Sequence, residues 1–249
     1  MRLIPQKLKP VDGLAHFFHL LLLVLLPIIA FVLVRLGFVQ IALVIVALSK
    51  WRMFSVRPRF WLTNIRTNSV DLTVGLSIVL FMGHSTNMLI QTALVIFYIY
   101  WLLSLKPATG LFMTSTQAFI GQLFGLTALY LIWANGPIYG LTLLTGAICF
   151  FAARHFLDSF NEPYARMLSY FWGYFGSALA WLFGHRLLFY GAVSQPTLLL
   201  STLGYGLAVI YYLDHNDRLS KAARRQFIFI MLAIVLVVLV FSDWGDKAV

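Results

Sequence analysis

The chain is poor in charge and almost free of cysteine. Only 10% of its 249 residues are charged, whereas 61% are apolar. With a mean hydropathy of +0.88, this composition excludes a soluble globular domain with a charged surface. A single cysteine, Cys149, excludes an intrachain disulfide framework and a cysteine-based zinc site. The scarcity of charge therefore predicts that the lipid bilayer is the solvent for most of this protein.

Long polar stretches are also missing, so we predict one transmembrane domain over residues 1–249 and no soluble domain. A transmembrane helix needs about 20 predominantly apolar residues. Nine segments approach this requirement, and together they predict an all-α, polytopic membrane bundle of about nine transmembrane helices. The candidate spans lie at about 14–34, 37–49, 69–83, 88–105, 115–133, 138–153, 167–189, 197–213 and 226–242.

The first two spans come from one apolar run between Leu14 and Ser49. At about 1.5 Å per residue, a helix of that length is too long for a single crossing. We expect the chain to fold back at Arg35 and Gly37, because they interrupt the apolar run. Segment 37–49 is short enough that either a full crossing or a re-entrant helix fits the sequence.

The lysines and arginines are distributed unevenly. Fifteen of the eighteen lie in alternate gaps between the candidate spans: the N-terminus, residues 50–66, Lys106, residues 154–166 and residues 218–225. Cytoplasmic loops of membrane proteins retain an excess of such cations. The pattern predicts a cytoplasmic N-terminus, a C-terminus outside, and a multi-pass protein of the cytoplasmic membrane.

Carboxylates are scarcer still, and all eight are predicted to lie in loops or at the ends of spans. Proton- and sodium-coupled carriers usually keep an ionisable side chain within a span, where its cost is tolerated for function. The sequence offers no such residue near the middle of a predicted span. This absence disfavours an ion-coupled carrier.

Small residues at four-residue spacing mark two spans as packing helices. Segment 167–189 carries two such rows, one with Gly173 between Ser169 and Ser177 and one with Gly176, Ala180 and Gly184, and segment 115–133 carries Gly121 and Gly125. Small side chains let helix backbones approach closely, and close packing drives helix association in lipid. We therefore expect both helices to contact neighbours inside the bundle.

Two predicted cytoplasmic loops concentrate acids, bases and histidine. A carboxylate pair beside a histidine can transfer protons, and arginines can hold a phosphate. The same groups can equally form an ion-paired turn at the membrane surface. The candidate polar site comprises Arg154, His155, Asp158, Glu162, Arg166, Asp214, Asp217 and Arg218.

The basic segment 50–66 also contains tryptophan and phenylalanine, a composition typical of an interfacial segment. We expect contact with anionic lipid headgroups through Lys50, Arg52, Arg57 and Arg59. The cations lie in short loops and not on one folded domain, so the net charge of +10 does not indicate nucleic-acid binding. The bilayer is the expected partner, and another membrane protein or a second copy of the chain is compatible with the sequence.

Lys50 followed after six residues by Arg57 and Pro58 resembles the first motif of the type-2 phosphatidic acid phosphatases. The resemblance covers nine residues. The second motif of that family is echoed only by Gly83 and His84, and the third is missing, so we assign no family. Asp12, His16 and His19 could share a helix face, but they lack a fixed fourth ligand, and we predict no metal and no cofactor.

Two classes of function remain open, and with them the question of whether the protein is an enzyme. The polar-poor spans favour a non-enzymatic membrane protein, either a small permease for an uncharged or lipid-like solute or a scaffold subunit. The alternative is an integral membrane enzyme that acts on a lipid phosphate or lipid-linked substrate at the cytoplasmic face, using the candidate polar site.

Overall fold

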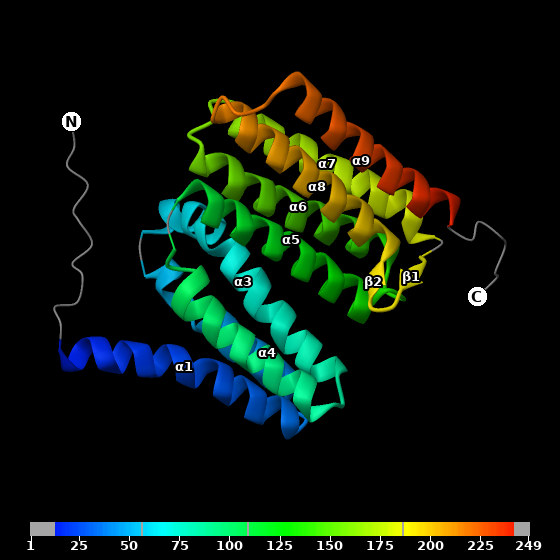
Figure 1. Cartoon of the computed structure of the whole chain (residues 1–249). Coiled ribbons are helices and arrows are strands. Elements are labelled where there is room, and N and C mark those ends of the chain that lie inside the picture. Colours follow the sequence, from blue (N-terminus) through cyan, green and yellow to red (C-terminus); the bar gives the residue numbers. More distant parts are fainter. Residues whose placement is uncertain (1–12, 56, 109, 186, 242–249) are drawn as a thin grey trace.

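A computed structural model describes residues 13–55, 57–108, 110–185 and 187–241. This part of the chain is helical, as the sequence predicts, with one short hairpin (Figure 1). The α-helices are α1 (Leu14–Arg35), α2 (Val39–Leu48), α3 (Trp61–His84), α4 (Met88–Tyr100), α5 (Leu111–Trp133), α6 (Ile138–Ser159), α7 (Ala165–Gly184), α8 (Gln195–His215) and α9 (Lys221–Val240). The shorter elements are the 3-10 turns η1 (Trp51–Phe54) and η2 (Pro58–Phe60), the π-helical turn η3 (Trp101–Leu105), and strands β1 (Phe189–Tyr190) and β2 (Val193–Ser194).

Six of the described helices are long and apolar enough to cross a membrane, namely α3, α4 together with η3, α5, α6, α8 and α9. The predicted count of about nine spans is therefore not supported. The apolar part of α1, Leu20–Arg35, and the ten-residue α2 are shorter than the bilayer core requires. Helix α7 has a suitable length, but serine, glycine and tyrosine residues dilute its apolar character.

The helices form two groups that meet along α3. Helices α1 to α4 pack around one core that includes Val74, Ile78 and Trp101. Helices α5 to α9 lie side by side as the second group (Figure 1). The two groups join where α3 packs against α5 and α6, so α3 is the central helix of the described structure.

Helix α3 begins eight residues before the span predicted at 69–83. Apolarity predicts where a helix enters lipid, but backbone hydrogen bonding continues the helix through polar residues. As a consequence Asp71 lies well inside α3 and only 8% exposed, and the expectation that every carboxylate lies in a loop or at a span end is wrong for this residue. The charge is tolerated because cations from two other segments reach it.

The chain folds back between α1 and α2 where the sequence predicts it, at Gly37, whose φ of +83° suits glycine. The hairpin of β1 and β2 is not predicted from the sequence. Its strands pair Phe189 with Ser194, and Gly191 at φ +65° forms the turn. The predicted span 167–189 is therefore too long, since α7 ends at Gly184 and the chain turns into the hairpin.

The small residues of α7 lie against α6. A β-carbon on Gly173 would come within 3.0 Å of the Gly146 carbonyl oxygen, and one on Gly176 within 2.7 Å of the Cys149 sulfur. Further along α7, Ala180 is fully buried and Gly184 faces Ile138. The two helices therefore approach with almost nothing between their backbones. In α5, Gly121 faces Val70 and Gly125 faces Thr73 and Ile148, which brings α3 and α6 close to it.

Candidate functional site

A cavity of about 780 Å³ lies between α5, α6, α7 and α8. Its walls are mainly aromatic and aliphatic, and none of the described side chains that line it carries a charge. Several lining residues are also exposed on the outside of the bundle, so the cavity is open to the surroundings of the helices. These exposed lining residues include Phe112, Phe171, Tyr205 and Leu207.

One buried amide organises the wall of this cavity. Gln122 of α5 donates a hydrogen bond to the Leu200 carbonyl at 3.0 Å and accepts one from the Trp172 indole, also at 3.0 Å. It therefore connects α5 to α7 and α8 without any charge. Because its donor and acceptor are both engaged, the wall can be uncharged and still have its polar groups satisfied.

Hydroxyl groups are found at one end of the cavity. Ser115 and Thr116 lie near the start of α5, and Tyr211 lies near the end of α8. The Tyr211 hydroxyl donates a hydrogen bond to Glu162, which stands just beyond the end of α6. A second hollow of about 650 Å³, between α7, α8 and α9, is lined by apolar side chains alone. Of these two hollows, only the cavity between α5, α6, α7 and α8 combines an apolar lining with polar groups at one end.

The residues of the predicted polar site divide among different partners. Asp158 contacts Arg154 one turn earlier in α6, at 3.0 Å, and Arg66 of α3, at 3.6 Å. His155 lies 3.0 Å from Gln117 of α5. Glu162 pairs with Tyr211 and Asp158 with the two arginines, so these acids contact other groups and do not form a single acid and base centre with His155.

The remaining residues of the predicted polar site, apart from Arg166, lie between the end of α8 and the start of α9. Asp214 pairs with Arg224 of α9 at 3.0 Å, and both side chains are more than half exposed. Asp217 occupies a turn at φ +53°, and Arg218 follows it at the surface. Arg166 lies over the ring of Tyr170. The described contacts therefore bring Arg154 and Asp158 together but do not connect them to residues 214–218.

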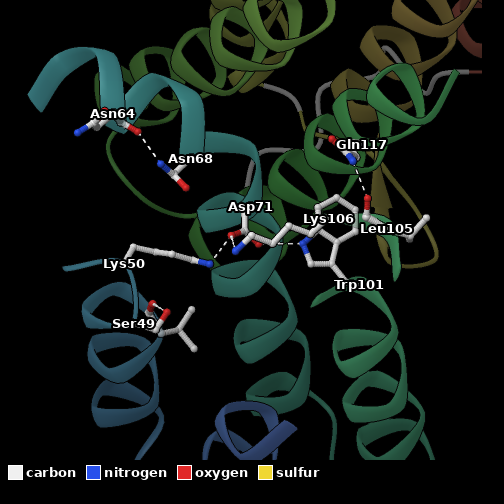
Figure 2. A network of polar contacts seen from close by, with 10 residues as sticks. Ser49, Lys50, Asn64, Asn68, Asp71, Trp101, Leu105, Lys106 and Gln117 are labelled. Carbon is white, nitrogen blue, oxygen red and sulfur yellow. Dashed lines mark hydrogen bonds and ion pairs between the residues drawn. The ribbon is translucent and has the colours of Figure 1, made fainter. Parts of the chain in front are cut away.

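A second polar centre involves residues that sequence reasoning did not group (Figure 2). Asp71 of α3 receives Lys50, which follows α2, and Lys106, which follows η3; the Lys106 nitrogen is 2.7 Å from the carboxylate. Both lysines contact the same oxygen, Oδ2. The Trp101 indole donates a hydrogen bond to the other oxygen, Oδ1, at 2.9 Å. We call Lys50, Asp71, Lys106 and Trp101 the Asp71 cluster.

Burial has a direct effect on the chemistry of Lys50. Its side chain is only 10% exposed. The loss of hydration lowers the pKa of Lys50 from its usual 10.5 to about 8, although the attraction of Asp71 opposes this change. Lys106 adds to the lowering by repulsion. Lys50 therefore exchanges its proton much closer to neutral pH than an exposed lysine does.

The structure also locates the predicted headgroup contacts. Lys50 is turned inward to Asp71, because a buried carboxylate requires a counter-charge, and it is not available to lipid. Arg57 and Arg59 are exposed, and the Arg59 guanidinium lies 4.6 Å from the centre of the Phe60 ring. The side chain of Arg52 lies outside the described part of the structure.

The metal alternative at the N-terminus, with Asp12, His16 and His19, also lies outside the described residues and side chains. Among the described residues, no group of three histidine, cysteine, aspartate or glutamate side chains could hold a metal ion. Comparison with protein-family models, curated proteins and solved structures finds no match for this chain.

Proposed function

We propose that this protein is a small permease that binds an uncharged or lipid-like solute in the cavity between α5, α6, α7 and α8. The observation that carries the proposal is the cavity itself. It has the volume of sites that hold small molecules, an apolar lining and a few polar groups. A solute with an apolar body buries that body against the aromatic walls and leaves its polar end near Ser115, Thr116 and Tyr211.

The lack of charge in the lining narrows the solute class. Burying an unpaired charge in an apolar site is costly, so a free anion or cation is a poor occupant. A neutral or zwitterionic amphiphile avoids this cost because its charged groups, if it has any, remain at the polar end. The exposed lining residues Phe112 and Phe171 offer such a molecule a direct route from the bilayer.

The orientation of the protein is part of this proposal. Consecutive helices run to alternate ends of the bundle in Figure 1, and the segments after α2, α4, α6 and α8 lie at the same end. Most of the cations lie in these segments or in the helix ends that flank them. We assign that end to the cytoplasm and the protein to the cytoplasmic membrane, with α1, α2 and α7 also embedded in the bilayer.

A labelling experiment tests the orientation. Cysteine introduced at Arg57, in a background with Cys149 replaced by serine, is treated in intact cells with a membrane-impermeant maleimide. The expected result is no labelling until the membrane is permeabilised. Cysteine at Thr86, in the connection between α3 and α4, provides the matched position and should react in intact cells. Reaction at Arg57 in intact cells would reverse the proposed orientation.

A quenching experiment tests solute binding. The probe is a monoacylglycerol with a brominated acyl chain, added to the protein in lipid nanodiscs, and the readout is the fluorescence of Trp172, obtained as the difference between wild type and Trp172→Phe. We expect saturable quenching. Ala208→Phe fills the cavity and should abolish it, whereas Ala178→Phe on the exposed face of α7 should leave it unchanged. Equal quenching in both variants would show that bulk lipid, and not the cavity, reaches Trp172.

Movement of a solute requires a separate assay. Proteoliposomes containing a phosphatidylcholine with a fluorescent acyl chain are treated with dithionite, which bleaches only the outer leaflet. Wild type should make the inner-leaflet probe accessible, and Ala208→Phe should prevent this. Saturable binding without any such movement would retain the cavity as a binding site and reject the permease.

A further inference from the structure

The Asp71 cluster carries unequal charge. Two ammonium groups, on Lys50 and Lys106, contact one carboxylate oxygen, so one positive charge is left without a partner in the cluster. Such an excess is expensive in surroundings of low polarity. The excess is relieved when the cluster either loses a proton or gains an anion.

Three segments of the fold contribute to this cluster: the end of α2, helix α3 and the turn η3. Helix α4 changes to the π-helical turn η3 at Trp101, and this turn ends just before Lys106. The change in helical pitch presents both the Trp101 indole and the Lys106 ammonium to Asp71. π-helical turns are rare and occur frequently at functional sites. Figure 2 shows Lys50 reaching the same carboxylate from the opposite side, at the end of α2.

The exposure of the two lysines indicates which of them loses its proton. Lys106 is 34% exposed and retains contact with water, so it can remain charged. Lys50 is 10% exposed, and an anion has little access to it. Among the described residues, Asp71 from α3 and Lys106 after η3 are the charged groups that face Lys50. Loss of the Lys50 proton leaves Asp71 and Lys106 as a balanced pair.

We propose that the Asp71 cluster is a proton-binding site, in which the Lys50 amine takes up and releases one proton while Asp71 and Lys106 stay ionised. On release, the nitrogen keeps the electron pair of the N–H bond and the proton passes to water or buffer on the side where Lys106 is exposed. The contact between Lys50 and Asp71 changes from an ion pair to a weaker hydrogen bond from a neutral amine to the carboxylate. Protonation therefore controls how strongly the end of α2 is held to α3.

The fluorescence of Trp101 provides the test, and it needs no solute. Its indole donates to Asp71 and is 1% exposed, so its emission responds to the charge of the cluster and not to solvent. The emission that belongs to Trp101 is the difference between wild type and Trp101→Phe in nanodiscs. The wild type should titrate with a midpoint near pH 8. Lys50→Met should abolish this titration, and Trp181→Phe, at an exposed position, should preserve it.

Lys106→Gln distinguishes a coupled cluster from an isolated lysine. Removing the repulsion of Lys106 should raise the midpoint by about 1 pH unit, and this partly exposed residue can be replaced without emptying a buried site. Three results would overturn the proposal: no titration of Trp101 between pH 6 and 10, a titration that survives Lys50→Met, or a midpoint that follows phosphate concentration at constant ionic strength. The last result would indicate an anion site. None of these outcomes bears on solute binding in the α5–α8 cavity.

Discussion

The two helix groups are held together by different physical means. In the group of α1 to α4, a buried carboxylate connects α2, α3 and η3 through charge. In the group of α5 to α9, α6 and α7 touch through Gly146, Gly173 and Gly176, and a neutral amide connects α5, α7 and α8. Charge can hold helices together across long side chains, whereas small residues require the backbones to meet. The second arrangement concentrates packing in one seam and leaves room for a cavity beside it.

The largest effect should come from removing the carboxylate of the first group. Asp71→Asn leaves two lysines without a counter-charge, which should lower the free energy of unfolding by about 3 to 5 kcal/mol. Cys149 is buried, so a thiol-reactive dye reports thermal unfolding of the solubilised protein. Asp214→Asn is the matched control, since its pair with Arg224 is mostly exposed and should contribute about 1 kcal/mol or less. Equal losses in the two variants would remove the contrast between buried and surface pairs.

The seam of the second group should be sensitive to volume. Gly176→Leu drives a side chain into Cys149 and should destabilise the protein by about 1 to 3 kcal/mol. Val237→Leu on α9 is the control, because Val237 is exposed and should tolerate the extra carbon with no measurable change. The same thermal assay applies. A silent Gly176→Leu variant would mean that α6 and α7 do not pack as closely as their glycines indicate.

The stability of the group of α1 to α4 should also depend on pH, and the direction of this dependence follows from the pKa of Lys50. The pKa of Lys50 is about 8 in the folded protein and 10.5 when exposed, so between these values the unfolded chain binds more protons. Stability should therefore rise with pH in this window, by about 1 kcal/mol between pH 8 and 9, and this gain should be missing in Lys50→Met. The measurement is the difference in melting temperature between wild type and variant from pH 7 to 10. A difference that stays flat would mean that Lys50 keeps an ordinary pKa.

The smallest effect should follow loss of a side-chain hydrogen bond across the seam. Ser177 donates to the Thr142 carbonyl at 3.2 Å. Ser177→Ala removes this donor but leaves small residues at the contact, so the cost should stay below about 1 kcal/mol. Comparison of its melting temperature with that of Gly176→Leu separates the two contributions. A loss as large as that of Gly176→Leu would assign the seam to hydrogen bonding instead of close packing.

Much of the helical layout follows from apolar runs, but the interior of the bundle does not. Runs of leucine, isoleucine and phenylalanine place α4, α5 and α8 within a few residues, because their ends coincide with polar turns. The sequence places the start of α3 too late because the hydropathy pattern stops at Arg66, whereas the helix continues through it. Hydropathy depends only on the residues of one segment, so it cannot show that Asp158 of α6 forms an ion pair with Arg66.

The candidate sites show the same limit. The Gly-x-x-x-Gly spacing marked residues that do lie at close contacts, but nothing in it names α6 as the partner of α7. The sequence predicts Lys50 and Lys106 only as loop cations, since their convergence on Asp71 depends on how three segments are placed in space. The cavity could not be expected at all, because it exists only where α8 lies across α5, α6 and α7.

The polar residues inside α3 also have a consequence for biosynthesis. A helix with Arg66 and Asp71 in its first three turns partitions poorly into lipid by itself, because an ionised group in a lone helix has no partner there. Lys50 emerges before α3 and Lys106 only after α4 and η3, so the second counter-charge arrives once the following helix has also left the ribosome. We expect α3 to remain at the translocon until its neighbours have emerged. Helix α9 should enter the bilayer unaided, because Met231 is its one buried residue among those described.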